Sequence, residues 1–169
     1  RNLMNGNLRA PWTIRAVQLD LARQRENLKS IEAFIAFSGR WGYNTIVLYL
    51  EGVISTPSFP YRSKEMSYSA EDVQAILRMA EKAGLEVIPG LATLGHAEHF
   101  VDCEALQSLR EAGSWYQHMF CPSNPETYQF LDGYVRDIAE MFPSTNLHIG
   151  CDEAWALGSC PACQKRLQN

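Results

Sequence analysis

Short apolar runs alternate with amphipathic stretches along this chain, and this alternation constrains its fold more than any other feature. The runs are rich in β-branched and aromatic residues and have the length of buried strands, whereas the stretches between them repeat apolar residues at helical spacing. Right-handed crossovers lay such strands parallel and side by side. The sequence predicts strands over 13–20, 43–51, 85–91 and 147–150, and helices over 24–38, 104–112, 125–142 and 161–167, with a further helix that opens at Ser69–Asp72 and ends before Gly84.

The predicted fold class is α/β, of the (β/α)8 TIM-barrel type. An eight-unit barrel takes about 250 residues, whereas this chain has 169. We therefore expect residues 1–169 to form a partial catalytic domain made of about the first four βα units. An open, doubly wound parallel sheet is the alternative.

Composition excludes several classes of partner. The net charge is −4 and Lys and Arg form no cluster, so we expect no nucleic-acid partner, because phosphate binding needs concentrated positive charge. No apolar stretch approaches the roughly 20 residues that cross a bilayer, so no membrane span is expected.

The five cysteines are an odd number, which favours a reducing compartment, the cytoplasm, over a disulfide framework. Because the sequence starts at Arg1, its composition does not decide whether an export signal precedes that residue.

Two adjacent carboxylates directly follow the fourth apolar run. Asp152 and Glu153 close the sextet that begins at His148, and Trp155 follows. Barrel enzymes hold their reactive groups at the carboxyl ends of the strands, and two carboxyls in different surroundings can divide the work of acid and base. The pair predicts a pocket with an aromatic floor that suits glycosidic bond cleavage, although an Asp-Glu pair alone is typical of a solvated helix start.

The other predicted strands also carry or end in ionisable groups. Arg15 and Asp20 lie in the first run, Glu51 ends the second, and His96 follows the third. A buried arginine needs a partner, so we expect Arg15 to meet a ligand hydroxyl or to form a structural ion pair with Asp20 or Glu51.

A Cys-Pro-Ala-Cys pair gives a competing interpretation. Cys160 and Cys163 can supply two thiolates to zinc or act as a redox couple. A structural zinc site needs four ligands, and only Cys151, the more distant Cys103 or Cys121, or histidines can complete it.

Several segments in sequential order resemble the first half of a glycoside hydrolase family 20 catalytic barrel, in particular its hexosaminidase D-like branch. They include the HIGCDE sextet that ends at Glu153 and a Gly-His-x-Glu segment from Gly95 to Glu98. The remaining ones are Arg15 to Arg23, Ser58 to Tyr61 and Leu85 to Pro89.

The resemblance implies a β-N-acetylhexosaminidase, acting without a cofactor on glycans that end in N-acetylglucosamine or N-acetylgalactosamine. The 2-acetamido oxygen of the substrate is then the nucleophile. It also implies that Glu153 is the acid and base, that Asp152 orients the acetamido group, and that Arg15, Glu51, His96 and His148 bind or support the sugar.

Two positions depart from the usual family pattern: Ala16 stands where Gly usually follows the arginine, and Phe100 stands near the place of a Trp.

The chain lacks the walls that the family builds from strands five to eight, so we expect a half-formed pocket with little or no turnover. A non-catalytic sugar-binding or structural half barrel is an alternative. Because exposed strand edges associate, we expect a homodimer or a missing carboxyl-terminal half barrel.

Overall fold

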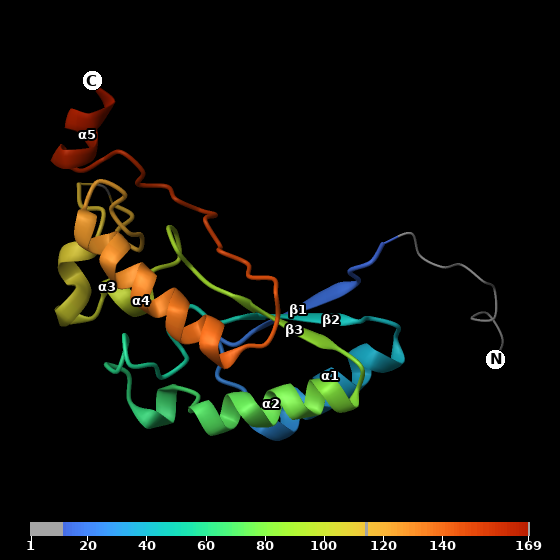
Figure 1. Ribbon diagram of the computed structural model, residues 1–169. Helices are drawn as coiled ribbons and strands as arrows, with labels where there is room; N and C mark the ends of the chain where they lie inside the picture. Colours follow the sequence, from blue (N-terminus) through green and yellow to red (C-terminus); the bar gives the residue numbers. More distant parts are fainter. Residues whose placement is uncertain (1–11, 114, 169) are drawn as a thin grey trace.

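The computed structural model describes residues 12–113 and 115–168, and a parallel sheet lies at its centre (Figure 1). Its strands are β1 (Ala16–Asp20), β2 (Thr45–Tyr49) and β3 (Glu86–Gly90), in the order β1-β2-β3. Both pairings are parallel and in one register, so that Ile46 lies opposite Val17 on one side and Val87 on the other. The three strands therefore end at a common edge, where the sequence analysis placed the ionisable groups.

The fourth predicted strand is present only as a single bridge. His148 pairs in parallel with Gly90, while its carbonyl accepts from the Leu91 N–H at 2.8 Å and its N–H donates to the Pro89 carbonyl at 3.0 Å. Within the described residues its other side has no strand partner, and the backbone turns at Gly150 with a φ of 50°. The segment thus lies beside β3 as predicted, but it is too short to form a strand.

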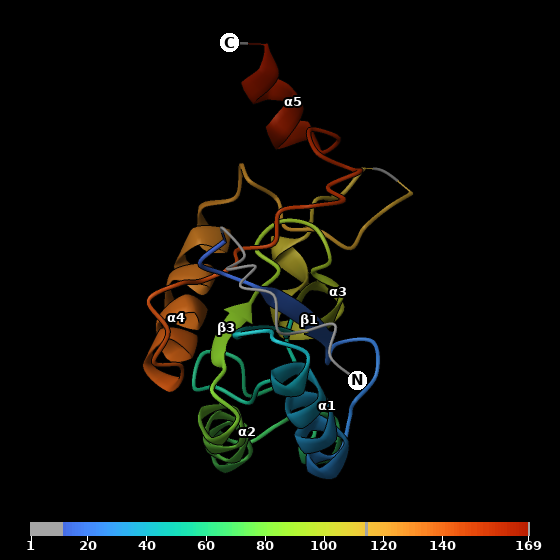
Figure 2. The ribbon, with the colours of Figure 1, turned by 90° about the vertical axis from the view of Figure 1, so that its right-hand side faces the viewer.

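Two amphipathic helices cover one face of the sheet. They are α1 (Leu28–Arg40) and α2 (Ala70–Lys82), which pack side by side beneath the strands in Figures 1 and 2. The predicted capping box is present, because the Ser69 hydroxyl accepts from the Asp72 N–H and the Asp72 carboxylate accepts from the Ser69 N–H. α1 begins later than predicted, because Asn27 caps it through the Ser30 N–H.

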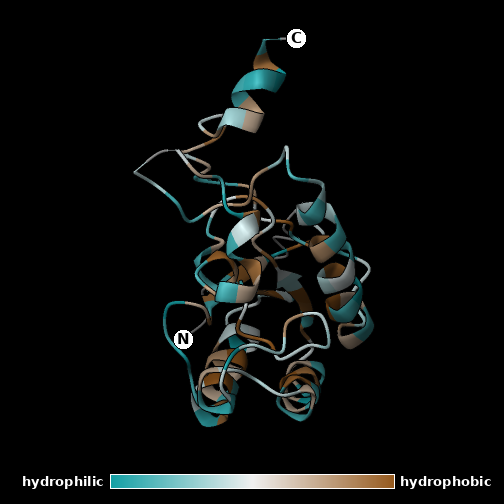
Figure 3. Ribbon diagram, turned by 90° about the vertical axis from the view of Figure 1, so that its left-hand side faces the viewer, coloured by the Kyte–Doolittle hydropathy of each residue, from teal (hydrophilic) through white to brown (hydrophobic). Residues whose placement is uncertain are grey.

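The two faces of the sheet differ in burial. Along β1, Val17 and Leu19 pack against the hydrophobic core, whereas Ala16 and Gln18 are exposed on the other face. A doubly wound sheet carries helices on both faces, so this one-sided cover favours the barrel type. Apolar residues gather between the helices and the sheet, as the brown segments of Figure 3 show.

Four further elements lie in the connections that follow β2 and β3. They are the 3-10 helix η1 (Lys64–Met66), the helix α3 (Glu98–Val101), the 3-10 helix η2 (Glu104–Leu109) and the helix α4 (Pro125–Met141). The helix predicted over 104–112 is therefore a 3-10 turn, and α3 was not predicted because four residues are too few to show a periodicity. An aromatic cluster fixes this region, in which Phe100 contacts Phe59, Phe120, Phe130 and Tyr134.

The chain ends in α5 (Pro161–Leu167), which lies apart from the sheet (Figures 1 and 2). An irregular segment leads to it from His148 across the carboxyl side of the sheet. Of the described helices, none has the length and apolar character needed to span a membrane.

Candidate active site

A cleft of about 820 Å³ opens at the carboxyl edge of the sheet. The ends of β1 and β2 form one wall, and the segment after the His148 bridge forms the other. The lining residues are Gln18, Asp20, Arg23, Tyr49, His96 and residues 147–153.

Close backbone packing holds the two adjacent acids in this cleft. The Thr93 N–H donates to the Gly150 carbonyl at 3.0 Å. Gly95 then packs so tightly on the carbonyl oxygen of Asp152 that a Cβ there would overlap it. Glu153 adopts a left-handed backbone with a φ of 51°. Glycine at residue 95 is therefore required for Asp152 and Glu153 to lie in the cleft.

His96 faces both carboxylates. Its Nε2 lies 3.2 Å from Oε2 of Glu153 and 3.7 Å from Oδ2 of Asp152. On the other side of the ring, Nδ1 lies 3.0 Å from an Arg23 nitrogen. A guanidinium only donates, so Nδ1 accepts, and the proton of the neutral ring sits on Nε2 and is directed at Glu153. The structure thus brings together the side chains of Asp152, Glu153 and His96.

Arg23 is the basic residue at the centre of the site. One of its terminal nitrogens lies 2.6 Å from Oε1 of Glu51 and 3.4 Å from Oδ2 of Asp20, and its guanidinium lies over the Tyr49 ring at 5.0 Å. Sequence reasoning did not assign Arg23 a role. Its position could have indicated a role, because Arg23 follows the strand-terminal Asp20 by three residues, where the chain turns at the carboxyl edge of the sheet.

Glu51 is buried behind Arg23 rather than lining the cleft, with 1% of its side chain exposed. Burial first, and then the charge of Glu98, raise the pKa of Glu51 to about 7, against the opposing effect of Arg23. His99, whose Nδ1 lies 3.4 Å from Oε2 of Glu51, is neutral because burial and the charges of Arg62 and Arg23 lower its pKa to about 4. The protonated and ionised forms of Glu51 are therefore similarly populated near neutral pH.

Backbone strain coincides with the site. Among the described residues, the non-glycine positions with positive φ are Glu51 (42°), His96 (52°) and Glu153 (51°). Such conformations cost about 1–3 kcal/mol each and cluster at functional sites. All three belong to the charge network described above.

Two predicted site residues lie elsewhere. Arg15 precedes β1, and its Nε donates to the Gly42 carbonyl at 2.9 Å while a terminal nitrogen reaches the Trp12 carbonyl at 3.4 Å. Gly42 lies just before β2, so Arg15 sits at the amino end of the sheet, opposite the acids. Arg15 therefore lies too far from the cleft for the sugar contact that the resemblance implies, and the predicted ion pair with Asp20 or Glu51 is wrong.

The predicted aromatic floor is also wrong. Trp155 turns outward with 66% exposure, because its N–H closes a tight turn onto the Glu153 carbonyl at 2.9 Å. Tyr49 is the aromatic side chain that lines the cleft, and His148 lines it as expected.

Two groups of side chains within the described ranges can offer at least three metal ligands. Glu51, His96 and Glu98 form one group, but Arg23 already supplies positive charge to it. Glu111, Cys121, Cys160 and Cys163 form the other, away from the cleft.

The family model described as glycosyl hydrolase family 20, catalytic domain, matches residues 47–169, which is most of the chain. The chain belongs to glycosyl hydrolase family 20. Hexosaminidase D of Homo sapiens is 30% identical over 168 residues, which cover 94% of this chain and 33% of the human protein. This family 20 chain thus spans about a third of that relative's length.

Solved structures agree with the assignment. A β-N-acetylhexosaminidase from Bacteroides fragilis is 26% identical with a TM-score of 0.76, over 92% of this chain and 35% of that one. A family 20 exo-β-N-acetylglucosaminidase from Vibrio harveyi, solved in complex with N-acetylglucosamine, shares the fold with a TM-score of 0.74 at 23% identity, over 94% of this chain and 30% of that one. The α/β fold therefore corresponds to part of the family 20 TIM barrel, and the doubly wound alternative is excluded.

Proposed function

We propose that this family 20 chain is the amino-terminal part of a catalytic barrel that removes terminal β-linked N-acetylhexosamine from glycans. The observation that carries the proposal is the placement of Asp152 and Glu153 beside His96 in the cleft at the carboxyl edge. The names of its relatives, and the N-acetylglucosamine bound by the Vibrio harveyi protein, support this substrate class.

Glu153 acts as the general acid and then as the general base. It protonates the leaving glycosidic oxygen while the substrate's acetamido oxygen attacks the anomeric carbon, and it later takes a proton from the water that opens the cyclic intermediate. Two displacements at one carbon retain its configuration. The Nε2–H of His96, 3.2 Å from Oε2, orients the carboxyl group.

Asp152 positions the internal nucleophile. Its carboxylate accepts from the acetamido N–H, which turns the acetamido oxygen toward the anomeric carbon and gains the advantage of proximity. The same fixed anion stabilises the positive charge that develops on the ring being formed. Both roles need a side chain open to the cleft, and Asp152 has 66% of its side chain exposed.

Arg23 supports the reaction from the wall of the cleft. Its side chain is 44% exposed, so the guanidinium can donate to sugar hydroxyls while Glu51 holds it from behind. Glu51 is then a positioning residue rather than a direct sugar contact.

Further barrel units are needed to close the site. The side chains of Asp152 and Glu153 are 66% and 53% exposed, and among the described residues the cleft is lined only by the ends of β1 and β2, Arg23, His96 and residues 147–153. Electrostatic catalysis depends on excluding water. We therefore propose that the 169-residue chain alone turns over little substrate.

The test uses the protein as its gene encodes it, beside the 169-residue chain. We expect the encoded protein to hydrolyse an aryl N-acetyl-β-glucosaminide or galactosaminide with retention of configuration. Glu153→Gln and Asp152→Asn should each lower kcat by about 10²–10⁴-fold, whereas Glu140→Gln, exposed on α4, should leave it unchanged. Full activity in both acid variants, or sugar binding without hydrolysis by the encoded protein, contradicts the proposal.

A further inference from the structure

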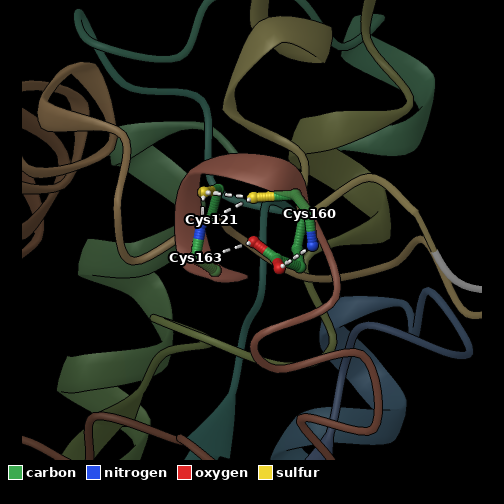
Figure 4. A group of neighbouring side chains, drawn as sticks. Cys121, Cys160 and Cys163 are labelled. Carbon is green, nitrogen blue, oxygen red and sulfur yellow. Dashed lines mark hydrogen bonds between the residues drawn. The ribbon is translucent and has the colours of Figure 1, made fainter. Parts of the chain in front are cut away.

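Four buried ligand-type side chains from three segments meet at the end of the molecule away from the sheet. Cys121 follows a bridge between Arg110 and Phe120, Glu111 follows η2, and Cys160 and Cys163 begin α5. Their exposed fractions are 4% for Cys121, 0% for Glu111, 7% for Cys160 and 4% for Cys163. Figure 4 shows the three cysteines turned toward one another from these separate parts of the chain.

The sulfur positions match tetrahedral zinc. Sγ of Cys121 lies 3.6 Å from Sγ of Cys160 and 3.7 Å from Sγ of Cys163. Zinc–sulfur bonds of about 2.3 Å at tetrahedral angles separate two sulfur ligands by roughly 3.8 Å. A disulfide would need about 2.05 Å, and all three thiols are free.

Glu111 completes a set of four donors. Its Oε2 lies 3.2 Å from Sγ of Cys163, and all four ligand atoms lie within 4.8 Å of one another. Its Oε1 accepts from the Cys160 N–H at 2.8 Å, which fixes the carboxylate in place. The Ser123 hydroxyl, 3.1 Å from Sγ of Cys163, adds an outer hydrogen bond of the kind that orients metal ligands.

Among the described residues, this group of four side chains includes no cationic one. Within the described ranges, no Lys, Arg or His forms an ion pair with Glu111. A fully buried carboxylate is costly unless it is paired or binds a metal. A divalent cation would therefore satisfy this carboxylate and the three thiols together.

We propose that Glu111, Cys121, Cys160 and Cys163 form a structural zinc site. Binding converts three thiols to thiolates and releases three protons, while the carboxylate binds as it is. Four protein ligands in a buried position leave no open coordination position, which is typical of structural rather than catalytic zinc. The inference does not depend on the proposed hydrolase activity.

Such a site would anchor α5 and the segment that bears the acids. The three cysteines form a buried cluster separate from the main core, and the rest of the seven-residue α5 is exposed. The segment 149–159 is held by the His148 bridge at one end and would be held by zinc at the other. Zinc would thus stabilise the loop that carries Asp152 and Glu153.

Metal analysis of the chain, purified under reducing conditions, reconstituted with zinc sulfate and desalted, tests the site. We expect one zinc per chain in the wild type and a loss of at least about tenfold in Cys121→Ser and Cys160→Ser. Cys151→Ser, which removes an exposed thiol, should keep one zinc. Cobalt in place of zinc should give the near-ultraviolet absorption of thiolate coordination.

A thiol titration keeps the test valid if the cysteine variants do not fold. In the native wild type, zinc should protect three of the five thiols from a soluble disulfide reagent, and a chelator should release them. Zinc below one-tenth per chain after reconstitution, zinc retained in Cys160→Ser, or a disulfide from Cys121 to Cys160 or Cys163 under reducing conditions would overturn the proposal.

Discussion

At the scale of single residues, the site is a network in which one arginine pairs with two carboxyl groups. Arg23 contacts Glu51, Asp20 and His96, and His96 in turn contacts Glu153. A continuous chain of contacts therefore links the buried Glu51 to the exposed Glu153. Because the pKa of Glu51 lies near 7, its protonation couples this network to pH.

The stability of the chain should carry the signature of Glu51. Its pKa rises from 4.5 to about 7 on folding, so between those values the folded state keeps a proton that the unfolded state has lost. This contribution to the free energy of unfolding falls as pH rises through that window, by up to about 3 kcal/mol. Glu51→Gln carries no such proton.

Denaturant unfolding at pH values between 5 and 8 measures the effect. Relative to wild type, we expect Glu51→Gln to become more stable as pH rises. His99, with its pKa lowered to about 4, has the opposite slope up to 6.5, but this term is present in both proteins. The exposed control Glu140→Gln should show no trend, and a pH-independent difference for Glu51→Gln would contradict the raised pKa.

Sequence reasoning singled out Asp152 and Glu153 but not Arg23, which contacts His96 beside them. Asp152, Glu153 and His96 were predictable because they follow apolar runs, and the carboxyl ends of parallel strands converge. Arg15 was misplaced because its sugar-binding role was taken from the family resemblance. It stands just before β1, which starts at Ala16 and carries the chain away from Arg15 toward the cleft.

At the scale of elements, the position of the acids depends on contact between two loops. The loop after β3 and the segment after His148 touch at Gly95, where a Cβ would overlap the Asp152 carbonyl. Gly95→Ala should push the acid segment away and lower kcat of the encoded protein at least about tenfold, because small misplacements of catalytic groups are costly.

The matched control is Gly84→Ala. Gly84 has a φ of 72° but open space around its Cβ position, at the end of α2, so the variant should lose about 1 kcal/mol of stability and keep its kcat. Equal kcat in Gly95→Ala and wild type would show that this contact does not seat the acids.

Elements with strong local signals were the predictable ones. The capping box at Ser69 and the Asn124 cap before Pro125 fix the starts of α2 and α4 where the sequence placed them. The bridge at His148 and the short α3 were harder to predict from the sequence, because contacts with neighbouring segments, and not local propensity, determine their conformation. The cluster around Cys121 could be predicted only in part from the sequence. Cys160 lies 39 residues from Cys121 along the chain, and Glu111 belongs to no spacing motif.

At the scale of the whole molecule, the sheet has two open edges. β1 pairs only with β2 among the described residues, and beyond β3 a single bridge at His148 ends the sheet. Ile14 and Ile149, near the two edges, are 49% and 56% exposed. Unpaired edges with exposed apolar residues associate with one another.

We therefore expect the 169-residue chain to self-associate in solution. Light scattering at increasing concentration should show a dimer or larger species, and Ile149→Lys, which places a charge at one edge, should lower the association. A monodisperse monomer at all concentrations would show that these edges are protected.

The central claim is that Glu153 donates the proton to the leaving group while Asp152 serves the internal nucleophile. Leaving groups of low pKa need little protonation, so the measurement is kcat/KM of the encoded protein on a dinitrophenyl N-acetylhexosaminide and on an N-acetylglucosamine disaccharide. We expect Glu153→Gln to lose at least about 10²-fold on the disaccharide and far less on the dinitrophenyl substrate, whereas Asp152→Asn should lose similarly on both. Equal losses on both substrates in Glu153→Gln would contradict its role as the acid.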